Sequence, residues 1–181
     1  MGIALAEAVL ERGCVPVVVS GPISRSYPKS AEVYGVETTE QMLRQCVSLF
    51  PDCKGVLGAA APCDFRPSCF SEQKLAKSEL NTEFLLRLEP TADILAALGT
   101  MKRPDQWILG FALETQHGRE KALEKLRRKK CDLIVLNGPD SIGRANASVE
   151  VFDVFGGRTA VLTGTKKQIA ADLLSLIEAA G

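Results

Sequence analysis

Continuous apolar segments that alternate with helical segments constrain the fold of this chain most strongly. Strand-like apolar runs lie at residues 15–19, 56–61, 107–112 and 132–136. Helical patterns lie at residues 2–12, 38–50, 91–98 and 118–130, and a closing amphipathic helix follows residue 165. A strand that is apolar along its whole length is typical of a sheet covered on both faces. The alternation therefore predicts an α/β fold with a mostly parallel sheet and helices on both faces.

Capping and turn signals support this order of elements. Thr38 and Thr165 are each followed three residues later by Gln, the pattern of a capping box, and Thr91 is expected to cap the short helix after it. Gly156-Gly157 lies between two alternating segments within residues 149–162. This pattern predicts a β-hairpin near the C-terminus.

Two features depart from the regular alternation. Residues 67–87 do not fit it, and residues 83–88 alternate like an exposed strand, so we expect an excursion that serves as a lid or a dimer contact. The chain also opens directly in a helix, without the strand that normally begins such a fold. We therefore expect open hydrogen-bonding edges in the middle of the sheet, in a truncated product or a chain that recruits a substitute strand. Residues 1–181 are expected to form a single domain.

Charge and cysteine patterns narrow the functional classes. Lys and Arg (22) balance Asp and Glu (22), so no overall field points to nucleic acid or a membrane surface. Six scattered cysteines and one histidine argue against a zinc site or a disulfide scaffold and favour the reducing cytoplasm. The G-x-G-x-x-G, Walker A and G-x-S-x-G sequences are absent. The usual dinucleotide, P-loop and hydrolase signatures therefore do not apply.

A loop after the second apolar run combines acidic, aromatic and basic residues. It reads Ala59-Ala60-Ala61-Pro62-Cys63-Asp64-Phe65-Arg66-Pro67, and Lys74 and Lys77 follow. An open α/β sheet binds ligands outside the carboxyl ends of its strands. An Asp beside an Arg and two lysines suits a phosphorylated ligand with a divalent metal. The alternative is a solvent-exposed polar loop after a core strand.

Three lysines recur along the helix predicted at residues 118–130. Lys121, Lys125 and Lys129 are four residues apart, so they share one helix face. Such a face could hold a triphosphate. It could equally be a solvated face, with Glu124 paired to Arg128 near the helix C-terminus.

Other candidate residues have equally simple structural explanations. The helix start at Ala92, Asp93, Ile94 and Leu95 could offer backbone N–H groups to a ligand, or be an ordinary first turn. Phe111, near the end of a strand, could stack on a base or fill the core. Residues 137–140 form a turn that could line the same crevice, and His117 is expected at the surface.

Several motifs in fixed order resemble the phosphopantothenate–cysteine ligase domain, in most bacteria the C-terminal half of the bifunctional coenzyme A biosynthesis flavoprotein. The similarity spans nearly the whole chain. The motifs are Val19-Ser20-Gly21-Pro22, Ala59-Ala60-Ala61 with Asp64-Phe65-Arg66-Pro67, Lys74, Thr91-Ala92-Asp93-Ile94-Leu95, Gly110-Phe111-Ala112-Leu113-Glu114-Thr115, and Lys125 through Asp132-Leu133-Ile134-Val135. The resemblance implies a Rossmann-like three-layer domain that forms a homodimer through an added strand region. It also implies that CTP, with Mg²⁺, activates the carboxylate of 4′-phosphopantothenate as an acyl-cytidylate, which the amine of L-cysteine attacks.

The resemblance also implies roles for individual residues. Lys74 matches the first lysine of a loop that closes over CTP and takes part in the reaction. The nucleotide-binding positions correspond to Ala59, Ala60, Ala61, Asp64, Lys74, Ala92, Asp93, Ile94, Leu95, Phe111, Lys125 and Lys129.

The chain departs from the family pattern in three places. The family's first strand, with its Asn and Ser-Ser-Gly turn, would precede Met1, and Ala76 replaces one loop lysine. The flavin-binding half is absent, so no FMN is expected. Two alternatives therefore stand beside the ligase: a homologue that binds nucleotide or a partner without catalysis, and a nicotinamide-dependent oxidoreductase.

Overall fold

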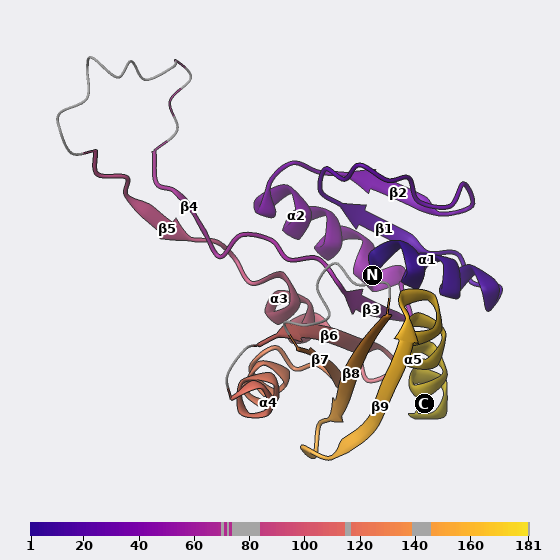
Figure 1. The fold of residues 1–181 in the computed structure, drawn as a ribbon. Coiled ribbons are helices and arrows are strands. Elements are labelled where there is room, and N and C mark those ends of the chain that lie inside the picture. Colours follow the sequence, from indigo (N-terminus) through magenta and orange to yellow (C-terminus); the bar gives the residue numbers. More distant parts are fainter. Residues whose placement is uncertain (70, 72, 74–83, 115–116, 139–145, 181) are drawn as a thin grey trace.

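A mixed sheet of five strands forms the centre of the structure, a computed structural model that describes residues 1–69, 71, 73, 84–114, 117–138 and 146–180 (Figure 1). The strand order is β3-β6-β7-β8-β9. The first three strands are parallel, and the last two add an antiparallel hairpin. Their bounds are Gly55–Gly58 (β3), Trp107–Leu113 (β6), Leu133–Asn137 (β7), Asn146–Asp153 (β8) and Arg158–Thr165 (β9).

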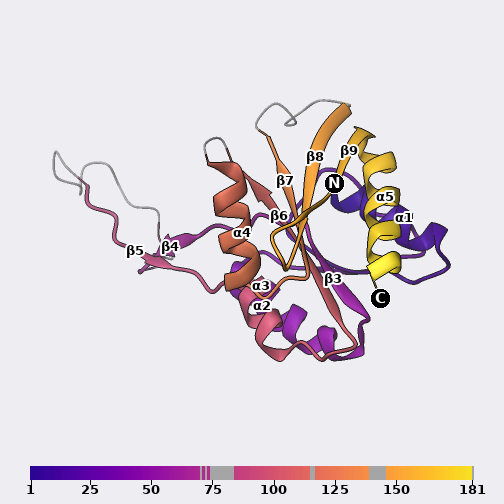
Figure 2. The same cartoon turned by 90° about the horizontal axis from the view of Figure 1, so that it is seen from below.

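Two layers of helices cover this sheet (Figure 2). One layer is formed by α1 (Gly2–Glu11) and α5 (Lys166–Ala180). The other contains α2 (Thr39–Leu49), the 3₁₀ turn Phe50–Asp52, α3 (Ile94–Met101) and α4 (Gly118–Arg128). Each layer has its own apolar cluster against one face of the sheet. The predicted α/β sandwich is confirmed, and its central sheet is mixed, with three parallel strands followed by an antiparallel hairpin.

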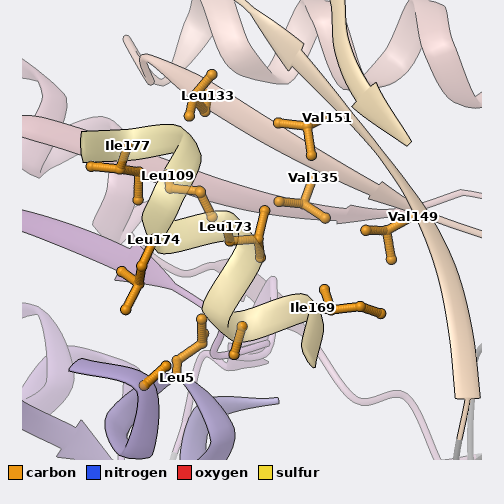
Figure 3. Packing of buried hydrophobic residues seen from close by; sticks show 12 residues of the cluster. Leu5, Leu109, Leu133, Val135, Val149, Val151, Ile169, Leu173, Leu174 and Ile177 are labelled. Atoms are coloured by element: carbon orange, nitrogen blue, oxygen red, sulfur yellow. The ribbon is translucent and has the colours of Figure 1, made fainter. Parts of the chain in front are cut away.

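The closing helix shows how the apolar spacing builds the core. Ile169, Leu173, Leu174 and Ile177 recur at helical spacing and are buried on one side of α5. Figure 3 shows them packed against the side chains of the central strands. Burying one large aliphatic side chain contributes about 1.5–3 kcal/mol to the free energy of unfolding. The contact between these four residues of α5 and the sheet is therefore a major source of stability.

A second parallel pair, β1 (Val17–Ser20) and β2 (Glu32–Gly35), is not hydrogen-bonded to the five-stranded sheet. Helix α2 packs against both β1 and α3, so the two sheets share one helix layer. Within the described residues, no strand pairs with the second edge of β1 or of β3. All of β3 is only half-buried, whereas Ile108 and Leu109 of its neighbour β6 are fully buried. The open edges expected from the sequence are therefore present on β1 and β3.

The excursion predicted from the sequence leaves the body as a two-stranded ribbon (Figure 1). β4 (Phe65–Pro67) and β5 (Leu88–Pro90) are antiparallel and form its base. Arg66 joins the ribbon to the body, because its guanidinium donates to Glu89 on β5 (2.8 Å) and to Glu40 on α2 (3.2 Å).

Most predicted boundaries agree with the structure, and two strand predictions were wrong. The strand expected at 56–61 ends at Gly58, because the Ala59 N–H donates back to the Leu57 carbonyl (2.9 Å) in a tight turn. The strand expected at 83–88 begins only at Leu88, and residue 83 lies outside the described residues. The capping boxes at Thr38 and Thr165 and the Gly156-Gly157 hairpin are confirmed.

Candidate functional site

Two hydrogen bonds from Thr91, just before α3, join this segment to the loop after β3. The Thr91 N–H donates to the Asp64 carbonyl (2.9 Å), and the Thr91 hydroxyl donates to the Cys63 carbonyl (2.5 Å). These bonds place Asp64 next to the residue that precedes Ala92. Ala60, Ala61, Asp64 and Ala92 are exposed and Ala59 is half-buried, so this segment is accessible to a ligand.

Asp93 caps α3, so the prediction that Thr91 is the cap was wrong. The helix begins at Ile94, and the Asp93 carboxylate accepts the Ala96 N–H (3.2 Å), as an N-cap residue does. The Thr91 hydroxyl instead donates to the Cys63 carbonyl in the loop after β3. Asp93 is therefore already engaged within the protein.

The side chains that follow Asp93 belong to the core. Ile94 is buried, and Leu95 packs so closely on β3 that a Cβ added at Gly58 would lie 2.7 Å from its Cδ1. Of these two residues, only the backbone N–H groups could therefore bind a ligand.

The end of α4 meets the start of α3 through an ion pair. The Lys129 ammonium lies 3.1 Å from the Asp93 carboxylate, and the Arg128 guanidinium lies 3.6 Å from it. This approach requires a glycine in α3, since a Cβ at Gly99 would lie 2.1 Å from the Lys129 carbonyl oxygen. Among the ion pairs of the described residues, Arg128 pairs with Asp93 and not with Glu124, so that predicted pair was wrong.

The other two lysines of α4 converge on Glu114, at the carboxyl end of β6. The Lys125 ammonium lies 2.5 Å from one oxygen of this carboxylate, and the Lys121 ammonium lies 3.6 Å from the other. The Glu114 side chain is only 11 % exposed. The hydrogen bond from Lys125, with the charge of both lysines, lowers the pKa of Glu114 below its ordinary value. The three lysines thus do not form a freely solvated face.

The remaining candidates are dispersed. Phe111 is half-buried and packs against the cluster under α1 and α5, whereas α3 and α4 contribute to the other cluster. His117 is exposed, as expected. The structure therefore brings together Lys121 with Lys125 and Asp93 with Lys129, but not Phe111 with the lysines. Lys74, Lys77 and residues 139–140 lie outside the described residues.

Two features of the structure were not predicted from the sequence. Glu114 was given no role, although it follows a strand and precedes the lysine helix, which is a usable signal. An open surface pocket of about 440 Å³ at the carboxyl end of β1 was also not predicted; its lining includes Ser20, Arg25, Tyr27 and Lys29. The Tyr27 hydroxyl donates to the Ser20 hydroxyl (3.2 Å) at its edge.

No three ligating side chains of the described residues are grouped so that they could hold a metal ion. Nor is any described helix long and apolar enough to cross a membrane.

Sequence comparison relates the chain to bifunctional proteins of coenzyme A biosynthesis. The family model for the DNA/pantothenate metabolism flavoprotein C-terminal domain (DFP) matches residues 1–180. A cysteine/cysteine sulfinic acid decarboxylase of an unknown prokaryotic organism is 35 % identical over 98 % of this chain and 50 % of its own length. The coenzyme A biosynthesis bifunctional protein CoaBC of Haemophilus influenzae is 30 % identical over 98 % of this chain and 44 % of its own length. The chain thus spans about half the length of these relatives.

Solved structures share this fold. The C-terminal domain of CoaBC superposes with a TM-score of 0.79 at 31 % identity, covering 98 % of this chain and 80 % of that one. A Cab2 H337A variant in complex with phosphopantothenate-cysteine has a TM-score of 0.76 at 16 % identity, covering 98 % and 76 % of the two chains. At that identity the Cab2 likeness concerns the fold alone. The chain belongs to the DFP family, the C-terminal domain of DNA/pantothenate metabolism flavoproteins.

Proposed function

We propose that this chain is a phosphopantothenate–cysteine ligase domain that uses CTP to join 4′-phosphopantothenate to L-cysteine. The observation that carries the proposal is a set of carboxylate-held lysines on α4 and its C-cap: Lys121 and Lys125 on Glu114 at the carboxyl end of β6, and Lys129 on Asp93 at the start of α3. Ammonium groups held next to a strand end and a helix start suit the phosphates of a nucleotide. Two comparisons support the proposal. The relatives of this chain include CoaBC, a coenzyme A biosynthesis bifunctional protein, and its fold is shared by a Cab2 variant solved with phosphopantothenate-cysteine.

The reaction would proceed in two balanced steps. A carboxylate oxygen of 4′-phosphopantothenate forms a bond to the α-phosphorus of CTP, while the bond to pyrophosphate breaks. The amine of cysteine then forms a C–N bond to the acyl carbon, loses a proton, and releases CMP. Negative charge builds on phosphoryl oxygens in the first step, and pre-positioned lysines stabilise such charge without reorganisation.

Mg²⁺ would be the accompanying metal ion. Mg²⁺ commonly uses only one or two protein carboxylates together with substrate phosphates. The exposed carboxylate of Asp64, held at the site by the bond between its carbonyl and Thr91, fits that role. When bound, the ion would neutralise phosphate charge.

Lys74 is the proposed catalytic residue, by its match to the family's lysine loop. We expect Lys74→Gln to abolish pyrophosphate release while the thermal unfolding temperature stays unchanged. Measured pyrophosphate release equal to that of the wild type would contradict this role.

A binding-only homologue is the second candidate. Within the described residues, β1 and β3 each have an edge with no strand beside it, and such an edge can pair with a strand of a partner. Calorimetric titration with CTP and Mg²⁺, with ATP and NADPH as comparators, tests nucleotide selectivity. Acyl-cytidylate detected by mass spectrometry after incubation with 4′-phosphopantothenate supports the ligase. Selective CTP binding without acyl-cytidylate supports the binding-only homologue instead.

We further propose that the protein is a cytoplasmic homodimer whose two copies contact each other through the β4–β5 ribbon. All six cysteines are free thiols, as suits a reducing compartment. The ribbon exposes several large apolar side chains away from the body, which is unusual for a surface that stays in water. They are Phe65, Phe84, Leu85, Leu86 and Leu88.

A further inference from the structure

Glu114 and Asp93, the two carboxylates that hold lysines of the site, differ in the groups that they bind. Asp93 also accepts the Ala96 N–H, so it is needed to cap α3 whether or not a lysine is present. Within the described part of the chain, the carboxylate of Glu114 contacts only the ammonium groups of Lys121 and Lys125. Among the described residues, its hydrogen bonds and ion pairs are therefore made to the two lysines.

The position of Glu114 is set by the backbone and by α4. Its N–H lies 3.4 Å from the Asn137 carbonyl at the end of β7, so the chain is held where β6 and β7 end. A Cβ at Gly118, in the first turn of α4, would lie 3.5 Å from the Glu114 Cβ. The carboxylate is thus confined between the sheet and the lysine helix.

The arrangement hides the negative charge and presents the positive one. The side chain of Glu114 is 11 % exposed, whereas those of Lys125 and Lys121 are 34 % and 52 % exposed. An anion that approaches from solvent therefore meets the ammonium groups first. Without the carboxylate, two neighbouring like charges on one helix face would repel and move apart into solvent.

We propose that Glu114 is a positioning residue that holds Lys125, and with it Lys121, in place for the phosphates of the nucleotide. This inference rests on the proposed function, since it names the residue that orders the lysines of that site. The Lys125 ammonium is held closely, at 2.5 Å from the carboxylate, and the Lys121 ammonium lies farther away, at 3.6 Å. A lysine already held in place loses less conformational entropy when a phosphate binds.

The test compares Glu114→Gln, Glu114→Asp and the matched control Glu124→Gln, which removes an exposed carboxylate from α4. Binding of CTP and of inorganic tripolyphosphate is measured by calorimetry. We expect Glu114→Gln to weaken both ligands about tenfold, as loss of one ordered charged contact does. Glu114→Asp keeps the charge but is shorter, so binding should be weakened to a lesser degree. Glu124→Gln should bind as the wild type does.

A double-mutant cycle separates positioning from a general structural effect. In a Lys125→Met background, adding Glu114→Gln should change tripolyphosphate binding less than twofold, because most of its effect acts through Lys125, the lysine it holds at 2.5 Å, and only the weaker 3.6 Å pair with Lys121 remains. In assays of ligase turnover, Glu114→Gln should raise the KM for CTP and leave the KM for cysteine unchanged. Thermal unfolding of each variant shows whether it is folded.

The outcomes separate this inference from the proposed function. If the wild type binds tripolyphosphate but shows no preference for CTP, the ligase proposal fails while the role of Glu114 can still be decided by the variants. If folded Glu114→Gln binds both ligands as the wild type does, or more tightly, the positioning role is wrong and the ligase proposal stands. A wild type that binds neither ligand overturns the inference.

Discussion

At the scale of single residues, the site is built from charges that the protein itself neutralises. Glu114 holds two lysines, and Asp93 holds Lys129 while it caps a helix. A helix cap and partly buried lysines are costly to leave without partners, so these pairs stabilise the fold as well as the site.

The lowered pKa of Glu114 predicts a pH dependence of stability. Because the folded state binds the Glu114 proton less readily than the unfolded chain does, ionised Glu114 stabilises the fold. This stabilisation is fully present above the pKa of Glu114 in the unfolded chain, about 4.3. It is lost as the pH falls through the lower pKa of Glu114 in the folded state. We expect Glu114→Gln to lower the free energy of unfolding at neutral pH and to reduce its loss below about pH 5.

Urea unfolding at a series of pH values measures this effect. Glu124→Gln is the control, because its carboxylate is exposed on the same helix. An acid-induced loss of stability that is identical in the wild type and Glu114→Gln would show that the ion pair contributes nothing.

At the scale of elements, close approach of α3 and α4 brings Lys129 to Asp93. Gly99→Ala adds a methyl group that would lie 2.1 Å from the Lys129 carbonyl oxygen, so the two helices must separate. We expect a loss of about 1–3 kcal/mol in the free energy of unfolding, and weaker nucleotide binding. Chemical denaturation measures the first and calorimetry the second.

The matched control is Gly35→Ala in β2, where an added Cβ meets no atom within 4 Å and no positive φ is recorded. Equal stability of both variants would mean that α3 and α4 adjust without cost.

The unpaired edges of β1 and β3 predict local differences in hydrogen exchange. The Ser20 carbonyl accepts from Val36 beside β2, so the neighbouring Val19 N–H points to the open edge. The Lys54 carbonyl accepts from Trp107, which by the same alternation directs the Leu57 N–H to the open edge of β3. We expect both amides to exchange faster than that of Val135 in β7, which lies between two paired strands.

Amide exchange followed by NMR provides the measurement. Protection at Val19 and Leu57 equal to that of Val135 would mean that these edges are covered in solution. The chain concentration should be varied, so that cover by a second copy is recognised.

At the scale of the whole molecule, the β4–β5 ribbon is the surface we expect to join two copies. Leu85 is 88 % exposed and Leu88 is 55 % exposed. We expect Leu85→Lys with Leu88→Lys to convert the dimer into a monomer, because charge at an apolar contact opposes association. Sedimentation equilibrium at micromolar concentration measures it.

Val161→Lys is a control, since this half-exposed apolar residue lies on β9, away from the ribbon. A wild-type protein that sediments as a monomer would refute the proposed dimer.

Much of the architecture was determined by the sequence alone, because its signals are local. Apolar runs, capping boxes at Thr38 and Thr165 and the Gly156-Gly157 turn depend on neighbouring residues, and they predicted the layers and the hairpin correctly. The strand end at Gly58 and the cap at Asp93 were not predicted. The strand end depends on a tight turn between Leu57 and Ala59, which apolar spacing does not reveal. The cap depends on tertiary contact, because Thr91 is bonded to the loop after β3 and Asp93 caps the helix instead.

The tertiary structure decided which charges meet. The spacing of Lys121, Lys125 and Lys129 placed them on one helix face, but it could not tell a solvated face from a binding one. Glu114 follows a strand end and Asp93 precedes another helix. Only the packing of α4 beside β6, and of its C-terminal end against α3, brings them within reach of the lysines. Side-chain spacing is a property of one element, whereas a pair of opposite charges between elements exists only once the core has placed those elements together.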